Sequence, residues 1–465
     1  SAPSRVDAWA VMDALPIEEV RSEFDAAVAR NRWVLVHAPT GSGKTLAAFL
    51  VAIDRILFAE TAEESTPAGE GVKSIGHAKG VRTLYLSPLK ALGVDVEKNL
   101  RAPLAGVTAV AQRDGFSYRR PTIGIRSGDT PATERRAMAR HPPDILITTP
   151  ESLYLLLTSQ AREILCSVDT VIIDEIHTMV STKRGSHLFL SLERLEELRF
   201  DRFANRDELA DTRPYRPLQR IGLSATQRPL DEVARLLSGY EFADEPLSPE
   251  NRHATPDPDE HPQPRPVTIV EAGRRKPMEL TVEVPVEDMA RLAESTAPTE
   301  IQTGPAAGPG IASIWPAIHP RLVELIRAHQ STMIFVNSRR LAERLSTAIN
   351  DLAEEPLAAA HHGSIAKDQR AIVEDKLKRG LLPAIVATSS LELGIDMGAV
   401  DLVIQIEAPP TIASGIQRIG RAGHQVGAVS EGVIFPKFRG DLLSCSAATE
   451  KMYIGEVEET FYPRN

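Results

Sequence analysis

Short apolar runs recur along the chain and alternate with longer stretches in which apolar residues have helical spacing. This alternation is typical of strands buried in a parallel sheet, because helices cover both faces of such a sheet. The pattern therefore predicts an α/β fold. The expected strands lie at residues 34–37, 83–86, 145–147, 170–173 and 220–223 in the first half, and at 333–336, 384–387 and 402–405 in the second.

A proline-rich stretch separates the two series. Proline fixes φ and has no backbone N–H, so this stretch is expected to form neither a regular helix nor a central strand. We therefore expect two α/β domains, residues 1–245 and 314–440, joined by a linker with short strands over residues 246–313. Residues 441–465 are expected to begin a further C-terminal region. The prolines are Pro246, Pro249, Pro256, Pro258, Pro262, Pro264 and Pro266.

Composition narrows the class of protein. Of the 465 residues 42% are apolar and 25% are charged, the usual balance of a globular protein. No apolar run approaches the roughly 20 residues of a membrane span, so no membrane partner is expected. Only two cysteines occur, Cys166 and Cys445, which favours a reducing cytoplasm. The net charge of −10 does not favour a nucleic-acid partner, but local basic and polar surfaces decide such binding.

A glycine-rich loop follows the first expected strand and precedes an apolar helix. Its glycines let backbone N–H groups turn toward phosphate oxygens, and the helix N-terminus adds partial positive charge. Lys44 can reach the β- and γ-phosphates of ATP, and the Thr45 hydroxyl can bind Mg²⁺. The alternative is a strand–helix turn that binds nothing. The loop reads Ala38, Pro39, Thr40, Gly41, Ser42, Gly43, Lys44 and Thr45.

Two carboxylates follow the apolar run at 170–173. Carboxyl ends of parallel strands form the ligand crevice of an open sheet, so Asp174 is the expected partner of Mg²⁺ and Glu175 the residue that orients the attacking water. A solvated strand end is the simpler reading of this pair. His177 is either a metal ligand or a polar link between the ATP site and the second domain, and we favour the link. Ser224 and Thr226, after another strand, can bond the acidic motif.

The second domain adds two long motifs, residues 387–401 and 417–424. Together with Asp-Glu-Ile-His at 174–177 and residues 178–185, they resemble the superfamily 2 helicases of the Asp-Glu-x-His type. Among these the chain is most similar to the bacterial large helicase-related (Lhr) family, over residues 34–441. The resemblance implies two tandem RecA-like domains with ATP bound between them. It also implies ATP and Mg²⁺ as cofactors and Gly394, Asp396 and Gln417 at the nucleotide.

The resemblance further implies that Arg421 reaches the γ-phosphate as an arginine finger and that Arg418 assists. The alternative is a pair of surface arginines on a helix. His424 stands where many relatives have another arginine. The chain also lacks the upstream glutamine with which many related helicases read adenine, since its first glutamine is Gln112.

Polar motifs after several strands resemble the family's single-strand contacts. Hydroxyls, amides and a few basic groups suit contact with the nucleic-acid backbone without base reading. Thr149 before a proline is also typical of a helix N-cap, and the two roles are compatible. His361 beside His362 can suggest a metal, but neighbours on a strand end point apart. The candidates are Ser87, Pro88, Lys90, Arg126, Ser127, Thr148, Thr149, Asn337, Ser338, Arg339, His362, Ser364, Thr388 and Ser389.

The motifs together predict an ATP-dependent helicase that translocates on one strand. The resemblance implies single-stranded DNA or a tailed duplex as partner, 3′-to-5′ movement and a role in DNA repair; an RNA:DNA hybrid is a further candidate substrate. One alternative is an Asp-Glu-x-His RNA helicase. Another is an ATP-gated nucleic-acid clamp that separates no strands.

Overall fold

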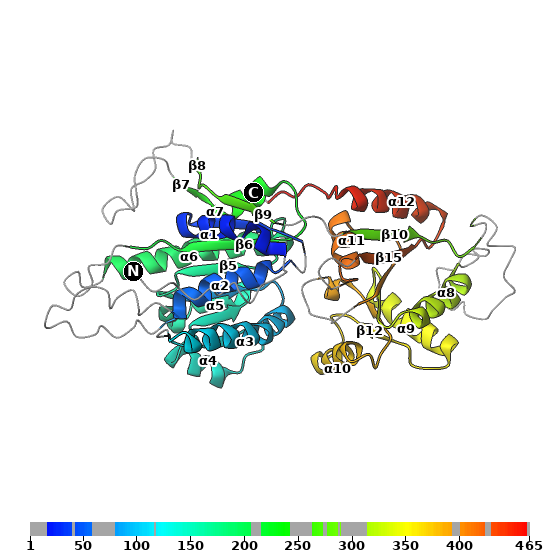
Figure 1. Ribbon diagram of the computed structural model, residues 1–465, viewed down its shortest axis with the longest axis horizontal. Coiled ribbons are helices and arrows are strands. Elements are labelled where there is room, and N and C mark those ends of the chain that lie inside the picture. Colours follow the sequence, from blue (N-terminus) through cyan, green and yellow to red (C-terminus); the bar gives the residue numbers. More distant parts are fainter. Residues whose placement is uncertain are drawn as a thin grey trace. The chain divides into compact units, whose positions relative to one another are not determined.

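The computed structural model describes residues 16–39, 42–57, 80–115, 118–205, 215–241, 263–272, 277–286, 289, 314–392, 400–423 and 429–462. The chain divides into two compact units. The first comprises Ser1–Arg274 and Glu459–Asn465, and the second comprises Arg275–Glu458. Each unit is a parallel sheet with flanking helices (Figure 1), which confirms the predicted α/β fold class.

The first unit is built on a sheet with the strand order β3-β4-β2-β5-β6-β1-β9, in which every pairing is parallel. Parallel pairing brings the carboxyl ends of all these strands to one edge, where the loops with the candidate chemistry begin. The strands are β1 (Trp33–His37), β2 (Thr83–Leu86), β3 (Ile123–Arg126), β4 (Ile145–Thr148), β5 (Thr170–Ile173), β6 (Gln219–Ser224) and β9 (Thr268–Glu271).

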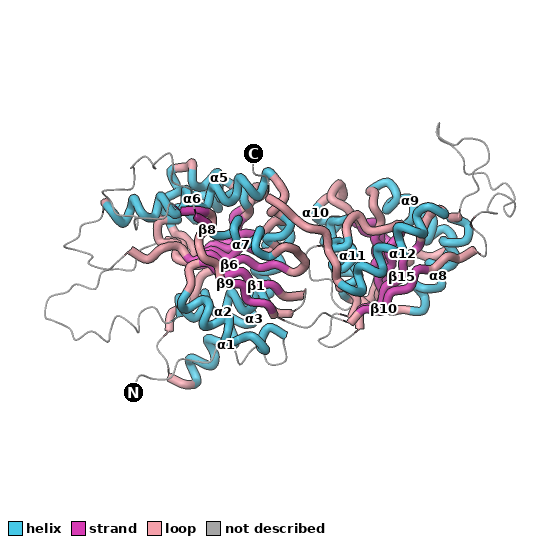
Figure 2. The backbone as a smooth tube through the Cα atoms, turned by 90° about the horizontal axis from the view of Figure 1, so that it is seen from above, coloured by secondary structure: helices cyan, strands magenta, loops and turns pink. Residues whose placement is uncertain are grey.

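Helices cover both faces of this sheet (Figure 2). Side chains alternate between the faces along each strand, so Val34 and Val36 of β1 belong to the same hydrophobic core as Phe49 of α2, while Leu35 belongs to a second core that includes Leu192 of α6. This two-sided burial explains why the strands read as continuous apolar runs. The helices are α1 (Arg21–Arg30), α2 (Lys44–Leu57), α3 (Lys90–Arg113), α4 (Ala132–Arg140), α5 (Pro150–Leu157), α6 (Lys183–Ala204) and α7 (Leu230–Ser238).

The second unit has a parallel sheet with the order β10-β15-β14-β11-β13-β12. Ile334 of β11 and Ile404 of β14 pack against α8 and α9, and Ile434 of β15 packs with α12. The strands are β10 (Met278–Val282), β11 (Thr332–Phe335), β12 (Ala358–His361), β13 (Ala384–Ala387), β14 (Leu402–Ile406) and β15 (Ser430–Phe435). The helices are α8 (Trp315–Ala328), α9 (Arg339–Ala353), α10 (Lys367–Lys378), α11 (Ile412–Ile419) and α12 (Arg439–Ile454).

The structure divides the chain differently from the expected linker over 246–313. β9 pairs with β1 of the first unit, and β10 pairs with β15 of the second, so the two short strands belong to different sheets. Within the proline-rich stretch, the two-residue β8 (Gln263–Pro264) pairs with β7 (Tyr240–Glu241). Pro246, Pro249, Pro256, Pro258 and Pro262 lie outside the described residues.

The C-terminal region also belongs to the two units. Helix α12 packs on the second unit through Cys445 and Met452. The chain then returns to the first unit, where the Thr460 N–H donates to the Arg228 carbonyl oxygen at 2.7 Å. Within the described ranges, no helix combines the length and the apolarity that crossing a membrane would require.

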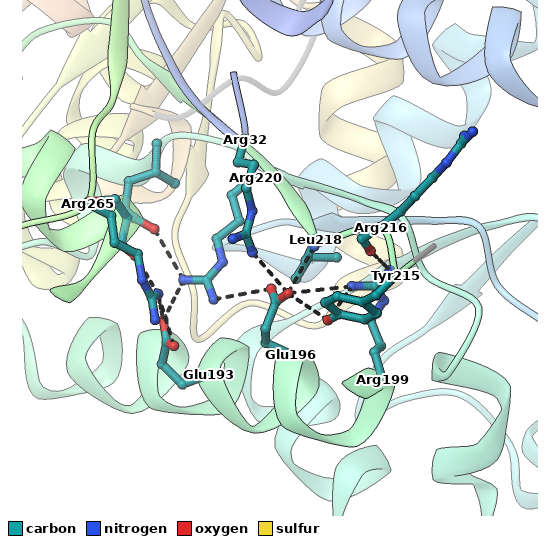
Figure 3. Close-up of polar contacts among 11 residues, drawn as sticks. Arg32, Glu193, Glu196, Arg199, Tyr215, Arg216, Leu218, Arg220 and Arg265 are labelled. Carbon is teal, nitrogen blue, oxygen red and sulfur yellow. Dashed lines mark hydrogen bonds and ion pairs between the residues drawn. The ribbon is translucent and has the colours of Figure 1, made fainter. Parts of the chain in front are cut away.

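A polar network stabilises the first unit at the amino ends of β1 and β6 (Figure 3). The Glu196 carboxylate on α6 accepts hydrogen bonds from Arg32 at 3.1 Å, from the Tyr215 hydroxyl at 2.8 Å and from the Leu218 N–H at 3.0 Å. Arg220 lies 4.0 Å from the same carboxylate and is only 1% exposed. Arg199 lies 3.7 Å from it as well. Because three arginines converge on Glu196, its charge compensates cations that are costly to bury.

The same network stabilises the position of Arg265, which lies in the segment just before β9. Arg265 donates to both oxygens of Glu193, at 3.0 and 3.1 Å, and to the Ser238 carbonyl oxygen at 2.8 Å. Its guanidinium lies 5.6 Å from the centre of the Trp33 ring. Arg220 donates to Glu193 as well, at 2.8 Å. These contacts hold β9 in place although its neighbourhood is rich in proline.

Replacing Glu196 by glutamine is expected to lower the free energy of unfolding of the first unit by about 2–3 kcal/mol, because the change removes a buried charge that accepts several hydrogen bonds. Urea denaturation followed by circular dichroism measures this. The control is Glu163→Gln, since Glu163 is 62% exposed and 4.0 Å from Arg162; its expected effect is below about 0.5 kcal/mol. Equal effects of the two substitutions would contradict the role of Glu196.

Candidate nucleotide-binding site and motor motifs

The glycine-rich loop joins β1 to α2, as its sequence predicts. Gly43 has φ +89°, a backbone conformation that L side chains rarely adopt. The Ser42 N–H donates to the Pro39 carbonyl oxygen at 3.2 Å, while its hydroxyl is buried without a hydrogen-bond partner among the described residues. A buried, unpartnered hydroxyl in such a loop fits a phosphate oxygen as its missing partner. Thr40 and Gly41 lie outside the described residues.

Lys44 and Thr45 open helix α2, and the Lys44 side chain is buried. Its ammonium is close enough to Asp174 to lower the pKa of that carboxyl group, although burial and Glu175 have the larger, opposite effects. β1 and β5 are separated in the sheet by β6 alone. The structure thus brings Lys44 and Asp174 together at the carboxyl edge, where the sequence predicts them.

Asp174 and Glu175 follow β5 directly and are both buried. One oxygen of Asp174 accepts the Glu175 N–H at 2.9 Å, and the other accepts the hydroxyl of Tyr85. Burial, with the nearby Glu175 charge, raises the pKa of Asp174 to about 6. Glu175 has φ +46°, an uncommon conformation for a residue with a side chain. Such strain is found mainly where it orients a functional group.

His177 lies between the acidic motif and the end of β6. Its Nδ1 is 3.4 Å from a carboxylate oxygen of Glu175 and 3.5 Å from the Ser224 hydroxyl. Burial, together with the Lys44 charge, lowers the pKa of His177 to about 3, so the imidazole is neutral near pH 7. Within the described ranges, no group of three or more His, Cys, Asp or Glu side chains has the arrangement of a metal site. His177 therefore connects Glu175 with the end of β6 inside the first unit, and its predicted link to the second domain stays a prediction. Thr226 follows two residues after Ser224.

The arginine motif of the second unit lies on and just after α11. Arg418 is 1% exposed, and its guanidinium donates to Glu392, to Asn337 at 3.1 Å and to Gln405 at 2.8 Å. It also lies over the Phe335 ring, 5.2 Å from its centre. Arg418 is therefore held by its own unit, and its donors organise neighbouring side chains.

Arg421 is buried and donates to the Glu392 carbonyl oxygen at 2.8 Å. Glu392 thus contacts both arginines. In the sequence it is a single acidic residue between two leucines, which gives little indication of this role. Gln417 is buried on α11. Gly394, Asp396 and His424 lie outside the described residues.

The nucleic-acid candidates of the first unit follow three neighbouring strands, β3, β4 and β2. Lys90 is exposed and lies 2.6 Å from Asp129, whereas the Ser87 hydroxyl donates to the Leu89 carbonyl oxygen at 2.7 Å. Thr149 accepts the Ser152 N–H at 3.4 Å and caps α5, which confirms its capping role. The remaining candidates at this edge are Pro88, Arg126, Ser127 and Thr148.

The candidates of the second unit follow the neighbouring strands β11, β13 and β12. Ser338 caps α9, and Arg339 donates to the Ser364 hydroxyl at 2.7 Å. His362 is buried against Glu343 at 2.7 Å, and His361 bonds Glu374 at 2.9 Å. The structure therefore gives each histidine a carboxylate partner of its own. Asn337, Thr388 and Ser389 complete this set.

Two family models match the sequence. The DEAD/DEAH box helicase model matches residues 20–233, and the helicase conserved C-terminal domain model matches residues 318–425. The chain belongs to the DEAD/DEAH box helicases. The resemblance to superfamily 2 helicases, drawn from the acidic and arginine motifs, is thereby confirmed.

Within these helicases the chain is similar to Lhr proteins. It is 47% identical to the Lhr helicase/probable uracil glycosylase of Mycolicibacterium smegmatis, which it matches over 100% of its own length and 27% of that protein. It is 43% identical to the Escherichia coli Lhr helicase/uracil glycosylase, over 94% of its length and 27% of that protein. This helicase chain thus spans about a quarter of these relatives.

Solved structures agree with this assignment. The Mycobacterium smegmatis helicase Lhr bound to single-stranded DNA and AMP-PNP is 47% identical, with a TM-score of 0.76 over 99% of this chain and 51% of that one. The RNA-bound DEAD-box helicase Mss116 is 14% identical, with a TM-score of 0.65 over 100% of this chain and 81% of that one, and shows the fold alone. The two units of this helicase are tandem RecA-like domains.

Proposed function

We propose that this chain is the motor core of an ATP-dependent DNA helicase that translocates along one strand. One observation carries the proposal. At the carboxyl edge of the first sheet, β1, β6 and β5 present the phosphate loop, Ser224 and the acidic pair, while the adjoining β2, β4 and β3 present the nucleic-acid motifs. ATP and a nucleic-acid strand would therefore bind along one edge of a single rigid sheet.

The ATP site has a role for each of its charged groups. Lys44, with the loop residues Thr40, Gly41, Ser42 and Gly43, would bind the phosphates. Glu175 would orient and polarise the attacking water. Thr45 and Asp174 offer hydroxyl and carboxylate oxygens, the kind of ligand that Mg²⁺ prefers. Few protein ligands are needed, because Mg²⁺ in such sites is bound mainly by water and substrate phosphates. Bound there, Mg²⁺ would neutralise charge on the β- and γ-phosphates.

The second unit would complete the site. We assign Arg421 to the γ-phosphate and Arg418 to holding Asn337, Gln405 and Glu392, because the donors of Arg418 are engaged within its own unit. Gly394, Asp396 and Gln417 would line the nucleotide on this side. ATP binding would close the two units on each other and hydrolysis would reopen them, and alternating grip on the strand would then give stepping.

DNA is proposed as the track because the structure of the Mycobacterium smegmatis relative contains single-stranded DNA. Movement in the 3′-to-5′ direction and a role in DNA repair follow from the family resemblance. The candidate contacts are mostly hydroxyls and amides, which suit the sugar-phosphate backbone. The helicase is therefore expected to bind without sequence specificity. Thr388 and Ser389, like Ser87 and Lys90, belong to this proposed path.

Replacing Lys44 by alanine is expected to weaken ATP binding about 10- to 100-fold, because charge-assisted bonds to phosphate contribute roughly 1.5–3 kcal/mol each. Equilibrium binding of a fluorescent ATP analogue measures this loss. Lys98→Ala is the control, since Lys98 is exposed on α3, and it should bind ATP as the wild type does. Unchanged affinity in Lys44→Ala would remove Lys44 from the phosphate site.

An unwinding assay on four matched tailed duplexes tests the proposed function. Each strand, the loading strand and the displaced strand, is made in DNA or in RNA. ATP-dependent displacement from a DNA loading strand supports the proposal, and displacement on 3′-tailed but not 5′-tailed DNA supports the polarity. Activity on RNA loading strands alone would make the chain an RNA helicase. ATP turnover stimulated by single strands, with no displacement of any duplex, would make it a clamp.

A further inference from the structure

A tyrosine that the sequence gives no reason to single out contacts the acidic motif. Tyr85 lies in β2, which pairs with β5 in the sheet, and its side chain is completely buried. Its hydroxyl donates a hydrogen bond to Asp174, and 89 positions separate the two residues. In the sequence, Tyr85 is one apolar member of a strand.

The contact defines how the Asp174 carboxylate is held. One carboxylate oxygen accepts the N–H of the next residue, and the other accepts the Tyr85 hydroxyl. The hydrogen bond from the backbone N–H alone does not fix the rotation of the carboxylate plane. Two donors on different oxygens do fix that rotation. Partners of this kind orient a metal ligand and are costly to lose.

The tyrosine ring is itself fixed from the phosphate-loop side. It stacks on Phe49 of α2, with ring centres 4.9 Å apart and an angle of 29° between the planes. Helix α2 begins with Lys44 and Thr45, so Tyr85 bridges the helix that carries these residues and the strand end that carries Asp174. Two residues further along the chain, Ser87 opens the proposed nucleic-acid motif.

We propose that Tyr85 is a positioning residue for Asp174, which sets the orientation in which this carboxylate meets the Mg²⁺ of bound Mg²⁺·ATP. This inference rests on the proposed ATPase function. Its consequence is specific: without the hydroxyl, nucleotide binding that depends on magnesium weakens, while binding that does not depend on magnesium is unaffected.

Tyr85→Phe tests the inference, because phenylalanine retains the ring that stacks on Phe49 and removes only the hydroxyl. The probe is a fluorescent ATP analogue, titrated once with excess MgCl₂ and once with EDTA on the same protein preparation. We expect affinity in magnesium to fall about tenfold, as is usual when a metal ligand loses the partner that orients it, and affinity in EDTA to stay unchanged. The magnesium concentration for half-maximal ATP turnover should rise correspondingly.

Tyr215→Phe is the matched control. Tyr215 also donates its hydroxyl to a carboxylate, that of Glu196, at 2.8 Å, but it lies in the network at the amino ends of β1 and β6. In Tyr215→Phe, the nucleotide affinities in magnesium and in EDTA should equal those of the wild type, even if this variant melts at a lower temperature. Equal losses of Tyr85→Phe in magnesium and in EDTA, or no loss in either, would overturn the inference. A wild-type chain that binds no nucleotide would overturn the proposed function and this inference with it.

Discussion

Glu175→Gln is expected to lower the rate of ATP hydrolysis by about a thousandfold and to leave ATP affinity within about twofold of the wild type. A glutamine has nearly the same shape but cannot accept a proton from water. The carboxylate is buried, and its backbone is held at φ +46° after β5. Single-turnover hydrolysis measures the rate, and binding of an ATP analogue measures the affinity.

The control for this substitution is Glu97→Gln. Glu97 pairs with Arg101 one turn away on α3, so the same loss of charge there should leave hydrolysis unchanged. A normal turnover rate in Glu175→Gln would remove Glu175 from its role. A parallel loss of ATP affinity would instead indicate that the residue contributes to binding, and that another group activates the water.

Arg421→Ala is expected to lower the maximal rate of ATP hydrolysis by about a thousandfold, because an arginine finger stabilises charge that develops on the γ-phosphate in the transition state. Binding of ATP should weaken far less. Steady-state turnover over a range of ATP concentrations separates the maximal rate from the affinity. Arg421→Lys should recover little of the rate, since an ammonium does not reproduce the planar fork of a guanidinium.

Arg379→Ala is the matched control in the second unit, because Arg379 is an exposed arginine that pairs with Asp375 on α10. It should hydrolyse ATP at the wild-type rate. Loss of ATP affinity with an unchanged maximal rate in Arg421→Ala would contradict the finger. The bond from Arg421 to the Glu392 carbonyl oxygen would then be its main contribution.

Much of the fold could be predicted because its signals are local. The run at 34–37 and the loop after it identify β1 and α2, since a strand buried on both faces must be apolar throughout. The order of the strands could not be predicted in this way. It depends on pairings such as β1 with β6, between residues far apart in the chain. The prolines around β9 predict a linker there, whereas in the structure β9 pairs with β1 and contacts of Arg265 with Glu193 and Ser238 hold the segment.

The candidate site, like the fold, has residues that the sequence identifies and others that only the folded chain reveals. Lys44, Asp174 and Glu175 could be proposed from the sequence because each lies in a motif of a few residues whose chemistry is recognisable without the fold. Tyr85 and Glu392 could not, because their roles depend on partners that only the folded chain brings near. The motif alone predicts that Arg418 assists catalysis, and only the folded chain shows that its donors bond Glu392, Asn337 and Gln405.

The most direct test of the proposed motor is the rate of ATP hydrolysis by the 465-residue chain as single-stranded DNA is added. A motor whose ATP site and nucleic-acid path share one sheet edge should hydrolyse ATP slowly alone. Its rate should rise manyfold to a plateau as DNA saturates the path. An ATP hydrolysis rate that does not change at any DNA concentration would contradict the account.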